Sequence, residues 1–177
     1  MAPTDSLRSF GHVFDQVAEA YDEVRPGYPP ELVDLAVARG HLCVGSRVLE
    51  VGAGTGKLTE SLVERGLIVD ALEPGPNMIA AARKRIGDTG SVTFHAGRFE
   101  DGDLPERAFD GLFSATAFHW VDPEIGWAKA ASRLRAGGLL ALLAYVGVSD
   151  EESAGVQAEL LEALRFRAPE IAGAWKP

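Results

Sequence analysis

Three glycines at alternate positions, Gly52, Gly54 and Gly56, follow an apolar run and precede a helical pattern. Glycine lets the backbone approach a ligand closely, and the first N–H groups of a following helix attract anionic groups. A dinucleotide site would carry the pattern G-x-G-x-x-G, but its third glycine position is Lys57 here. The turn therefore predicts a nucleotide-like ligand other than NAD or FAD, with a purely structural turn as the alternative.

Two acids stand near this turn in the sequence. Glu73 ends the second expected strand about 20 residues after the turn, where a carboxylate can accept hydrogen bonds from both ribose hydroxyls. Glu50 lies in the apolar strand before the turn, and a buried acid needs a polar partner, which a cationic amine would supply. Pro74 and Met78 place apolar groups where an adenine ring can lie. A solvated Glu73 and a core Met78 are the alternatives.

His119 is the best candidate for acid–base chemistry. It follows the fourth expected strand beside Trp120, and open α/β sheets bind ligands at the carboxyl ends of their strands. Histidine can accept a proton near neutral pH. The alternative is that His119 and Trp120 pack structurally or against a cofactor. The four histidines are scattered and no H-x-x-x-H or C-x-x-C occurs, so we expect no metal site.

Three side chains near the N-terminus are candidates for a lid over substrate and cofactor: Tyr21, Arg25 and Tyr28. Arg25 would pair either with a substrate carboxylate or with one of the neighbouring acids, Asp22 and Glu23.

Short apolar runs alternate with helical patterns along the chain, which is typical of an α/β fold with a parallel sheet. The expected strands cover residues 47–51, 67–72, 91–95, 109–114 and 139–145. The expected helices cover residues 14–21, 30–38, 57–65, 78–86, 123–134 and 154–166. In the helix over 123–134 we expect Trp127 and Leu134 to face inward.

The composition argues against several classes of partner. A formal net charge of −9 repels phosphate backbones, so we expect no nucleic acid. The run over 139–146 is too short to span a bilayer, and residues 1–6 lack the start of a signal peptide. The single cysteine, Cys43, lies in an apolar stretch and is expected to be buried. It excludes an intrachain disulfide, and we expect a soluble, cytoplasmic protein without a membrane partner.

Several motifs together resemble one family. Residues 48–56 resemble motif I of the class I S-adenosylmethionine methyltransferases, residues 72–78 resemble its acidic ribose-binding motif, and residues 134–140 resemble the glycine pair before its fifth strand. Residues 14–29 and 117–121 are similar to the small-molecule branch that includes trans-aconitate methyltransferases. This resemblance implies a doubly wound, Rossmann-like parallel sheet of strand order 3-2-1-4-5 with N-terminal helices, and S-adenosylmethionine as cofactor.

The resemblance also implies roles for single residues. The backbone of the glycine turn would hold the methionine part of the cofactor, with Glu50 ordering its amine through water. Glu73 would bind the ribose, and the carbonyl of Ser114 would face the amine. Residues 97–100 fall where the family contacts the adenine edge, often with an Asp that this chain lacks. The expected cofactor-binding residues are Glu50, Gly52, Ala53, Gly54, Gly56, Glu73, Pro74, Met78, Gly97, Arg98, Phe99, Glu100 and Ser114.

The implied reaction is methyl transfer to a small-molecule acceptor. Such a displacement mainly requires alignment and exclusion of water, and a general base only where the acceptor loses a proton. A non-catalytic protein that binds S-adenosylmethionine or S-adenosylhomocysteine is the alternative, and Lys57 opposes a nicotinamide-dependent oxidoreductase.

The expected organisation is one domain over residues 1–177. It comprises a helical lid over 1–45, a cofactor-binding core over 46–146 and a C-terminal helix over 147–177. The family normally adds a sixth strand and an antiparallel seventh, which the sequence does not supply. Truncation, strands from another chain and a degenerate binding protein are the competing explanations. An exposed fifth strand would invite association, so a homodimer through this edge is expected as one possibility.

Overall fold

The computed structural model describes residues 26–145 without a gap, together with residues 15, 18, 22, 23 and 162. The chain divides into two compact units, Met1–Leu143 and Ala144–Pro177. Most of the predicted helix over 154–166 lies outside the described residues, and its one described residue, Glu162, is helical. Of the predicted helix over 14–21 the structure describes Asp15 and Ala18, and both are helical.

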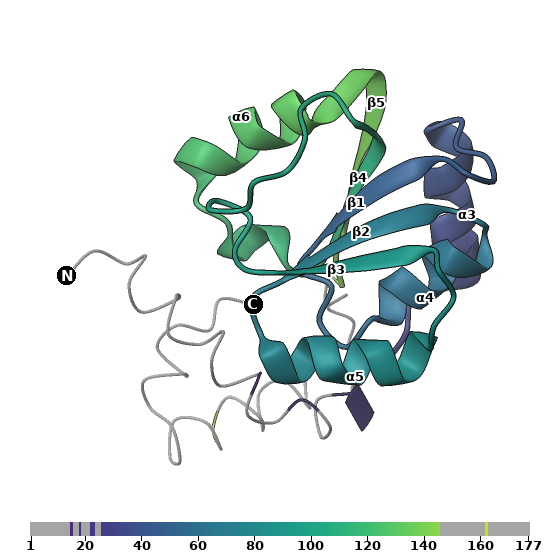
Figure 1. Ribbon diagram of the computed structural model, residues 1–177, viewed down its shortest axis with the longest axis vertical. Coiled ribbons are helices and arrows are strands. Elements are labelled where there is room, and N and C mark those ends of the chain that lie inside the picture. The colour runs from purple at the N-terminus through teal and green to yellow at the C-terminus, as the bar shows by residue number, and fades with distance from the viewer. Residues whose placement is uncertain (1–14, 16–17, 19–21, 24–25, 146–161, 163–177) are drawn as a thin grey trace. The chain divides into compact units, whose positions relative to one another are not determined.

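The first unit is built on a parallel sheet, as the sequence predicts (Figure 1). Its described strands are β1 (Arg47–Val51), β2 (Ile68–Glu73), β3 (Val92–Ala96), β4 (Phe109–Ala115) and β5 (Leu134–Leu143). Their order is β3-β2-β1-β4-β5, and every neighbouring pair is parallel. The predicted strand order is confirmed.

Helices cover both faces of this sheet. The described helices are α3 (Pro30–Arg39), α4 (Lys57–Glu64), α5 (Pro76–Ile86), the short 3-10 helix η1 (Phe118–Trp120) and α6 (Pro123–Arg133). Right-handed crossovers place α4 and α5 on one side, because the chain moves outward in one direction from β1 to β3. The step from β4 to β5 runs the other way, so α6 lies on the opposite side (Figure 1).

Two apolar clusters fill the space between the sheet and these helices. Side chains alternate along each strand, so Val48 belongs to one cluster and Leu49 to the other. Val48 packs in the cluster with Leu58 of α4, whereas Leu49 packs in the cluster with Ala130 of α6. The sheet is therefore buried on both faces, which holds the carboxyl ends of its strands in fixed positions.

The fifth strand begins earlier than the sequence predicts. It starts at Leu134 rather than Leu139 and ends at Leu143 rather than Tyr145. Leu134 pairs with Phe109, the register then shifts, and Leu139 pairs with Gly111. Gly137 has a positive φ of 79° within this irregular segment. The glycine pair therefore interrupts the strand instead of preceding it.

Two predictions of burial are wrong. Trp127 is 52% exposed, because α6 packs through its small residues Gly126 and Ala130 and leaves Trp127 beside the contact. Cys43 is also exposed, since it lies in the surface connection between α3 and β1, where its N–H donates to the Ser46 hydroxyl.

Within the part of the chain that the structure describes, no helix combines the length and the apolar character that crossing a membrane requires.

Candidate functional site

A cavity lies where the chain leaves β1 and β4. These strands are neighbours, yet the helices that follow them pack on opposite faces, so the two connections diverge at the carboxyl edge of the sheet. The cavity is lined by residues of both connections and of the segment before α3: Pro26, Tyr28, Glu50, Gly52, Ala53, Gly54, Thr55, Lys57, Leu58, Ala115 and Thr116. It is the place where a doubly wound sheet binds its ligands.

The three glycines of the turn after β1 are needed for different structural reasons. All three have positive φ, which favours glycine. A Cβ on Gly52 would lie 2.3 Å from that of Ala117, and one on Gly56 would lie 2.9 Å from that of Ala82. A Cβ on Gly54 would meet no described atom within 4 Å. Gly52 and Gly56 thus permit close packing, whereas Gly54 leaves its backbone open beside the cavity.

Glu73, at the end of β2, ties two turns together. Its carboxylate accepts hydrogen bonds from the Gly54 N–H (2.9 Å) and from the Gly75 N–H (2.9 Å). Burial raises its pKa, the two backbone hydrogen bonds counteract that rise, and nearby Asp15 adds to it. Glu73 is therefore an ordered acid between the two turns, not a solvated one.

Glu50 is an acid buried inside the sheet and exposed only 1%. The Thr59 hydroxyl of α4 donates to its Oε2 at 2.6 Å. Burial raises the pKa of Glu50, the Thr59 hydrogen bond lowers it, and the charge of Glu73 raises it. Together these effects raise the pKa of Glu50 to about 8. The polar partner expected for Glu50 is thus a neutral hydroxyl. Because its pKa lies near 8, the carboxyl group is mostly protonated at neutral pH.

The turn after β2 is closed by a side chain from the N-terminal segment. Asp15 Oδ1 accepts from the Asn77 N–H (2.8 Å) and the Met78 N–H (3.2 Å), which caps the start of α5. Pro74 is exposed, whereas Met78 is buried, with only 4% of its surface exposed. The structure thus shows Met78 packed in the interior, and its contact with an adenine ring stays a prediction.

The predicted adenine-edge residues form the turn after β3. The Gly97 N–H donates to the Glu73 carbonyl, which joins this turn to the end of β2. Phe99 is buried in the core, while Arg98 pairs with Glu100 Oε1 at 2.6 Å. The same Glu100 oxygen accepts from the Asp122 N–H at 2.9 Å. These contacts bring the segment beside Glu73 and leave its contact with a base a prediction.

Ser114 is the residue predicted to face the ligand at the end of β4, but the cavity wall begins at the next residue, Ala115. Ser114 is buried and its hydroxyl donates to the Val51 carbonyl at 2.7 Å, which joins β4 to β1. The next two residues, Ala115 and Thr116, line the cavity. Thr116 has a positive φ of 50°, and its hydroxyl lies 3.2 Å from that of Tyr28. Of the three lid candidates, Tyr28 reaches the cavity, whereas Tyr21 and Arg25 lie outside the described residues.

His119 and Trp120 belong to η1, just after this wall. Both are exposed, and their rings lie 4.8 Å apart between centroids. Neither belongs to the described residues that line the cavity. The structure brings His119 to the expected edge of the sheet, and its role as a base stays a prediction.

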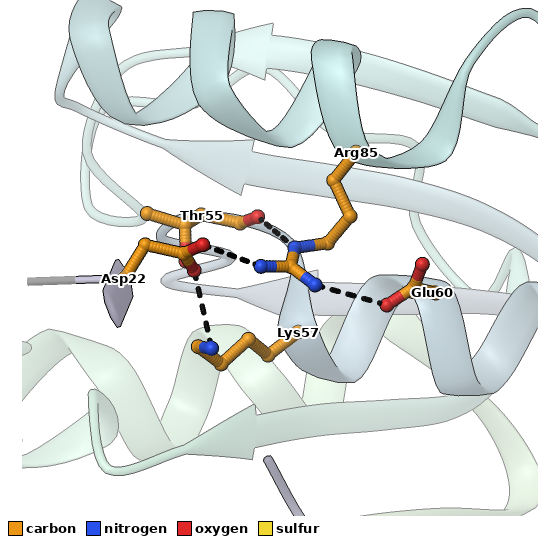
Figure 2. A network of polar contacts seen from close by, with 5 residues as sticks. All are labelled: Asp22, Thr55, Lys57, Glu60 and Arg85. Carbon is orange, nitrogen blue, oxygen red and sulfur yellow. Dashed lines mark hydrogen bonds and ion pairs between the residues drawn. The ribbon is translucent and has the colours of Figure 1, made fainter. Parts of the chain in front are cut away.

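A network beside the glycine turn was missed by sequence reasoning. Figure 2 shows Asp22 of the N-terminal segment between Thr55, Lys57 and Arg85. The Thr55 hydroxyl donates to Asp22 Oδ1 at 2.6 Å, and Lys57 Nζ lies 3.2 Å from the same oxygen. Arg85 donates to Asp22 Oδ2 at 2.5 Å. Asp22 was considered only as a partner of Arg25.

Lys57 carried a signal that could have revealed this network. It is the first residue of α4, where the positive end of the helix dipole disfavours a cation. A lysine there needs an acid nearby, and Asp22 supplies it. Within the described residues, no three His, Cys, Asp or Glu side chains are grouped so that they could hold a metal ion.

Comparisons with known proteins bear on this geometry. The model of a family described as "Methyltransferase domain" matches residues 49–142. An uncharacterised methyltransferase of Mycobacterium tuberculosis is 39% identical over 140 residues, 79% of this chain and 55% of that protein. One of Geobacillus thermodenitrificans is 31% identical over 155 residues, 82% of this chain and 71% of that protein. This chain therefore spans little more than half the length of the mycobacterial relative.

Among solved structures, phosphoethanolamine N-methyltransferase 2 of Haemonchus contortus is similar in fold. It was solved in complex with phosphomonomethylethanolamine and S-adenosylhomocysteine. The TM-score is 0.66 at 20% identity, over 90% of this chain and 40% of that one. At this identity the likeness concerns the fold.

Proposed function

Because this chain belongs to the methyltransferase domain family, we propose that it binds S-adenosylmethionine in the cavity after β1 and β4. We propose further that the methyl group passes to a small-molecule acceptor. When bound, this cofactor supplies an electrophilic methyl group on a sulfonium. The residues that line the cavity would hold the cofactor.

The observation that carries the proposal is the position of Glu73. A carboxylate has about four lone-pair sites, and two of them accept the Gly54 and Gly75 N–H groups. The remaining two match the two hydroxyls of a ribose. Because Glu73 is already fixed by backbone donors, binding a ribose requires little reordering of this side chain. The open backbone at Gly54 fits a ligand that must lie against the turn.

Glu50 fits the cationic amine at the other end of such a ligand. It lines the cavity, and its pKa is raised chiefly by burial. A bound amine would favour the ionised carboxylate and lower this pKa. Glu50 thus holds a proton in the free protein and accepts a charge-assisted interaction in the complex.

The acceptor side involves the segment after β4. Alignment and exclusion of water are what the transfer requires, and Tyr28 and Thr116 form the wall there. Tyr21, Arg25 and Trp120 complete the proposed lid, and His119 is the proposed base for acceptors that lose a proton. Cofactor binding without turnover is the competing function, and an assay of methyl transfer over a panel of acceptors separates the two.

Association through β5 is a further part of this proposal. Among the described strands β5 pairs with β4 alone, and Leu142 in it is 46% exposed. An edge strand with an exposed apolar side chain favours pairing with a second copy, and native mass measurement tests this. A cytoplasmic location is also proposed, since a single cysteine suits a reducing compartment.

Calorimetry with S-adenosylhomocysteine and with NADH tests the cofactor. We expect binding of the first and not of the second. Glu73→Ala should weaken binding about 100-fold or more, since it removes hydrogen bonds to a charged group. Glu64→Ala, an exposed acid on α4, is the matched control and should bind like the wild type. Tight binding of NADH alone would refute the proposal.

A further inference from the structure

The cavity wall combines one acid and one cation. Glu50 and Lys57 both line it, and both belong to segments that flank the glycine turn. A free α-amino acid end carries an ammonium and a carboxylate, so it presents the opposite pair of charges. Once a bound amine favours the ionised form of Glu50, the two side chains are the electrostatic complement of such an end.

Lys57 occupies a position that is unfavourable for a cation. It is the first residue of α4, where the helix dipole repels positive charge. Its side chain is mostly buried, with 18% exposed. Both conditions oppose a charged ammonium group, so the structure must compensate for them. The compensation comes from Asp22, whose Oδ1 lies 3.2 Å from Lys57 Nζ.

Asp22 is itself held by other groups. Thr55 and Arg85 each donate to it, and Arg85 also bonds to the Thr55 carbonyl and to Glu60 (Figure 2). Burial alone would raise the pKa of Asp22, but the Thr55 hydroxyl and the Lys57 and Arg85 cations hold it below its usual value. Asp22 is therefore held in place by Thr55 and Arg85 as well as by Lys57.

The ammonium group of Lys57 has more N–H donors than its contact with Asp22 uses. It carries three N–H groups, and within the described part of the chain Asp22 is the acceptor that pairs with it. Lys57 can thus keep its contact with Asp22 and still donate into the cavity that it lines. No exchange of partners is needed when an anionic group enters.

We propose that Lys57 is a specificity-determining residue of this site, whose ammonium group binds the α-carboxylate of the ligand's amino-acid end while Glu50 faces the amine. Asp22 is a positioning residue that holds Lys57 toward the cavity. The inference rests on the proposed binding of S-adenosylmethionine and adds a selectivity to it. The site should prefer adenosyl ligands that carry an amino-acid end over those that lack it.

The test compares two ligands across matched variants. S-adenosylhomocysteine has the amino-acid end, and methylthioadenosine has the same adenosine and thioether without it. Lys57→Gln should weaken binding of S-adenosylhomocysteine about tenfold to a hundredfold, the range of a charge-assisted hydrogen bond. Binding of methylthioadenosine should change by less than about twofold. Lys57→Arg keeps the charge and should retain most of the preference.

Asp22→Asn tests the positioning role with the same pair of ligands. The preference for S-adenosylhomocysteine should shrink although Lys57 is present. A merely structural role would weaken both ligands equally and leave their ratio unchanged. Thermal melting of each variant monitors folding, and the ratio of the two affinities is read independently of it.

The outcomes separate this inference from the proposed function. An equal loss for both ligands in Lys57→Gln, or an unchanged ratio, overturns the role of Lys57 while cofactor binding stands. A wild-type protein that binds neither ligand overturns the proposed function and the inference with it.

Discussion

The two sides of the cavity are built differently. On the β1–β2 side, backbone and carboxylate groups bond to each other: Glu73 holds the turns at Gly54 and Gly75, and the Leu72 carbonyl accepts from the Gly52 N–H. On the β4 side, the chain passes from a strained Thr116 into η1, which exposes His119 and Trp120.

This difference suits two kinds of ligand. A cofactor that is always the same can be held by a backbone frame, whose geometry a single side-chain substitution changes little. An acceptor that differs among related proteins is better met by side chains on a connection outside the sheet. The contrast supports the proposal that the cofactor lies against the β1–β2 side and the acceptor against the β4 side.

The largest expected effect on stability comes from Gly52, which packs against Ala117 where the two sides of the cavity touch. Gly52→Ala places a Cβ 2.3 Å from that of Ala117 at a positive φ. We expect a loss of about 2–5 kcal/mol in the free energy of unfolding, from backbone strain and overpacking together. Urea denaturation measures it.

Gly54→Ala is the control for this substitution. It has the same kind of positive φ but no described atom within 4 Å of the added Cβ, so it should cost only about 1–2 kcal/mol. Equal losses in the two variants would show that the contact between the sides does not constrain the turn.

The next effect concerns the buried acid on the cofactor side. The pKa of Glu50 is about 8 in the folded protein against an ordinary 4.5. As pH rises, the unfolded chain therefore loses this proton first, which favours unfolding. The contribution of Glu50 to stability should be greatest below about pH 4.5 and fall until about pH 8, by about 2–5 kcal/mol in total.

Glu50→Gln should remove most of this pH dependence, because glutamine resembles the protonated acid and stays neutral. Chemical denaturation at several pH values compares the two proteins. The variant should match the wild type near pH 5 and exceed it near pH 9. Parallel pH curves for both proteins would show that ionisation of Glu50 is not what opposes folding.

The smallest effect is expected on the β4 side. His119→Ala removes an exposed side chain and should change the free energy of unfolding by less than about 0.5 kcal/mol. Binding of S-adenosylhomocysteine should also be nearly unchanged, as measured by calorimetry. If His119 is a base for the acceptor, kcat falls in this variant while cofactor affinity holds. A large loss of cofactor affinity would place His119 on the cofactor side instead.

The parallel sheet was predictable from the sequence, because alternation of apolar runs and helical patterns depends on local residues, and the resemblance of the motifs to a known family implied its strand order. Burial on the helices was less predictable. Trp127 has the size of a core residue, but small neighbours at Gly126 and Ala130 let α6 approach the sheet elsewhere. Such packing depends on which face the helix presents to the sheet, which no local pattern specifies.

The site divides in the same way. Glu50, Glu73 and the glycines follow from spacing along two successive strands, so the sequence could place them. The contacts of Asp22 with Lys57 and Arg85 join segments far apart in the chain. Their pairing depends on where the N-terminal segment meets α4 and α5, and the sequence shows only that each residue is charged.

A crystal structure of the protein with S-adenosylhomocysteine tests the central claim most directly. We expect the ligand in the cavity after β1 and β4, with both ribose hydroxyls at hydrogen-bond distance from the Glu73 carboxylate, about 2.5–3.0 Å. A ligand bound elsewhere, or a ribose with no contact to Glu73, would contradict the account.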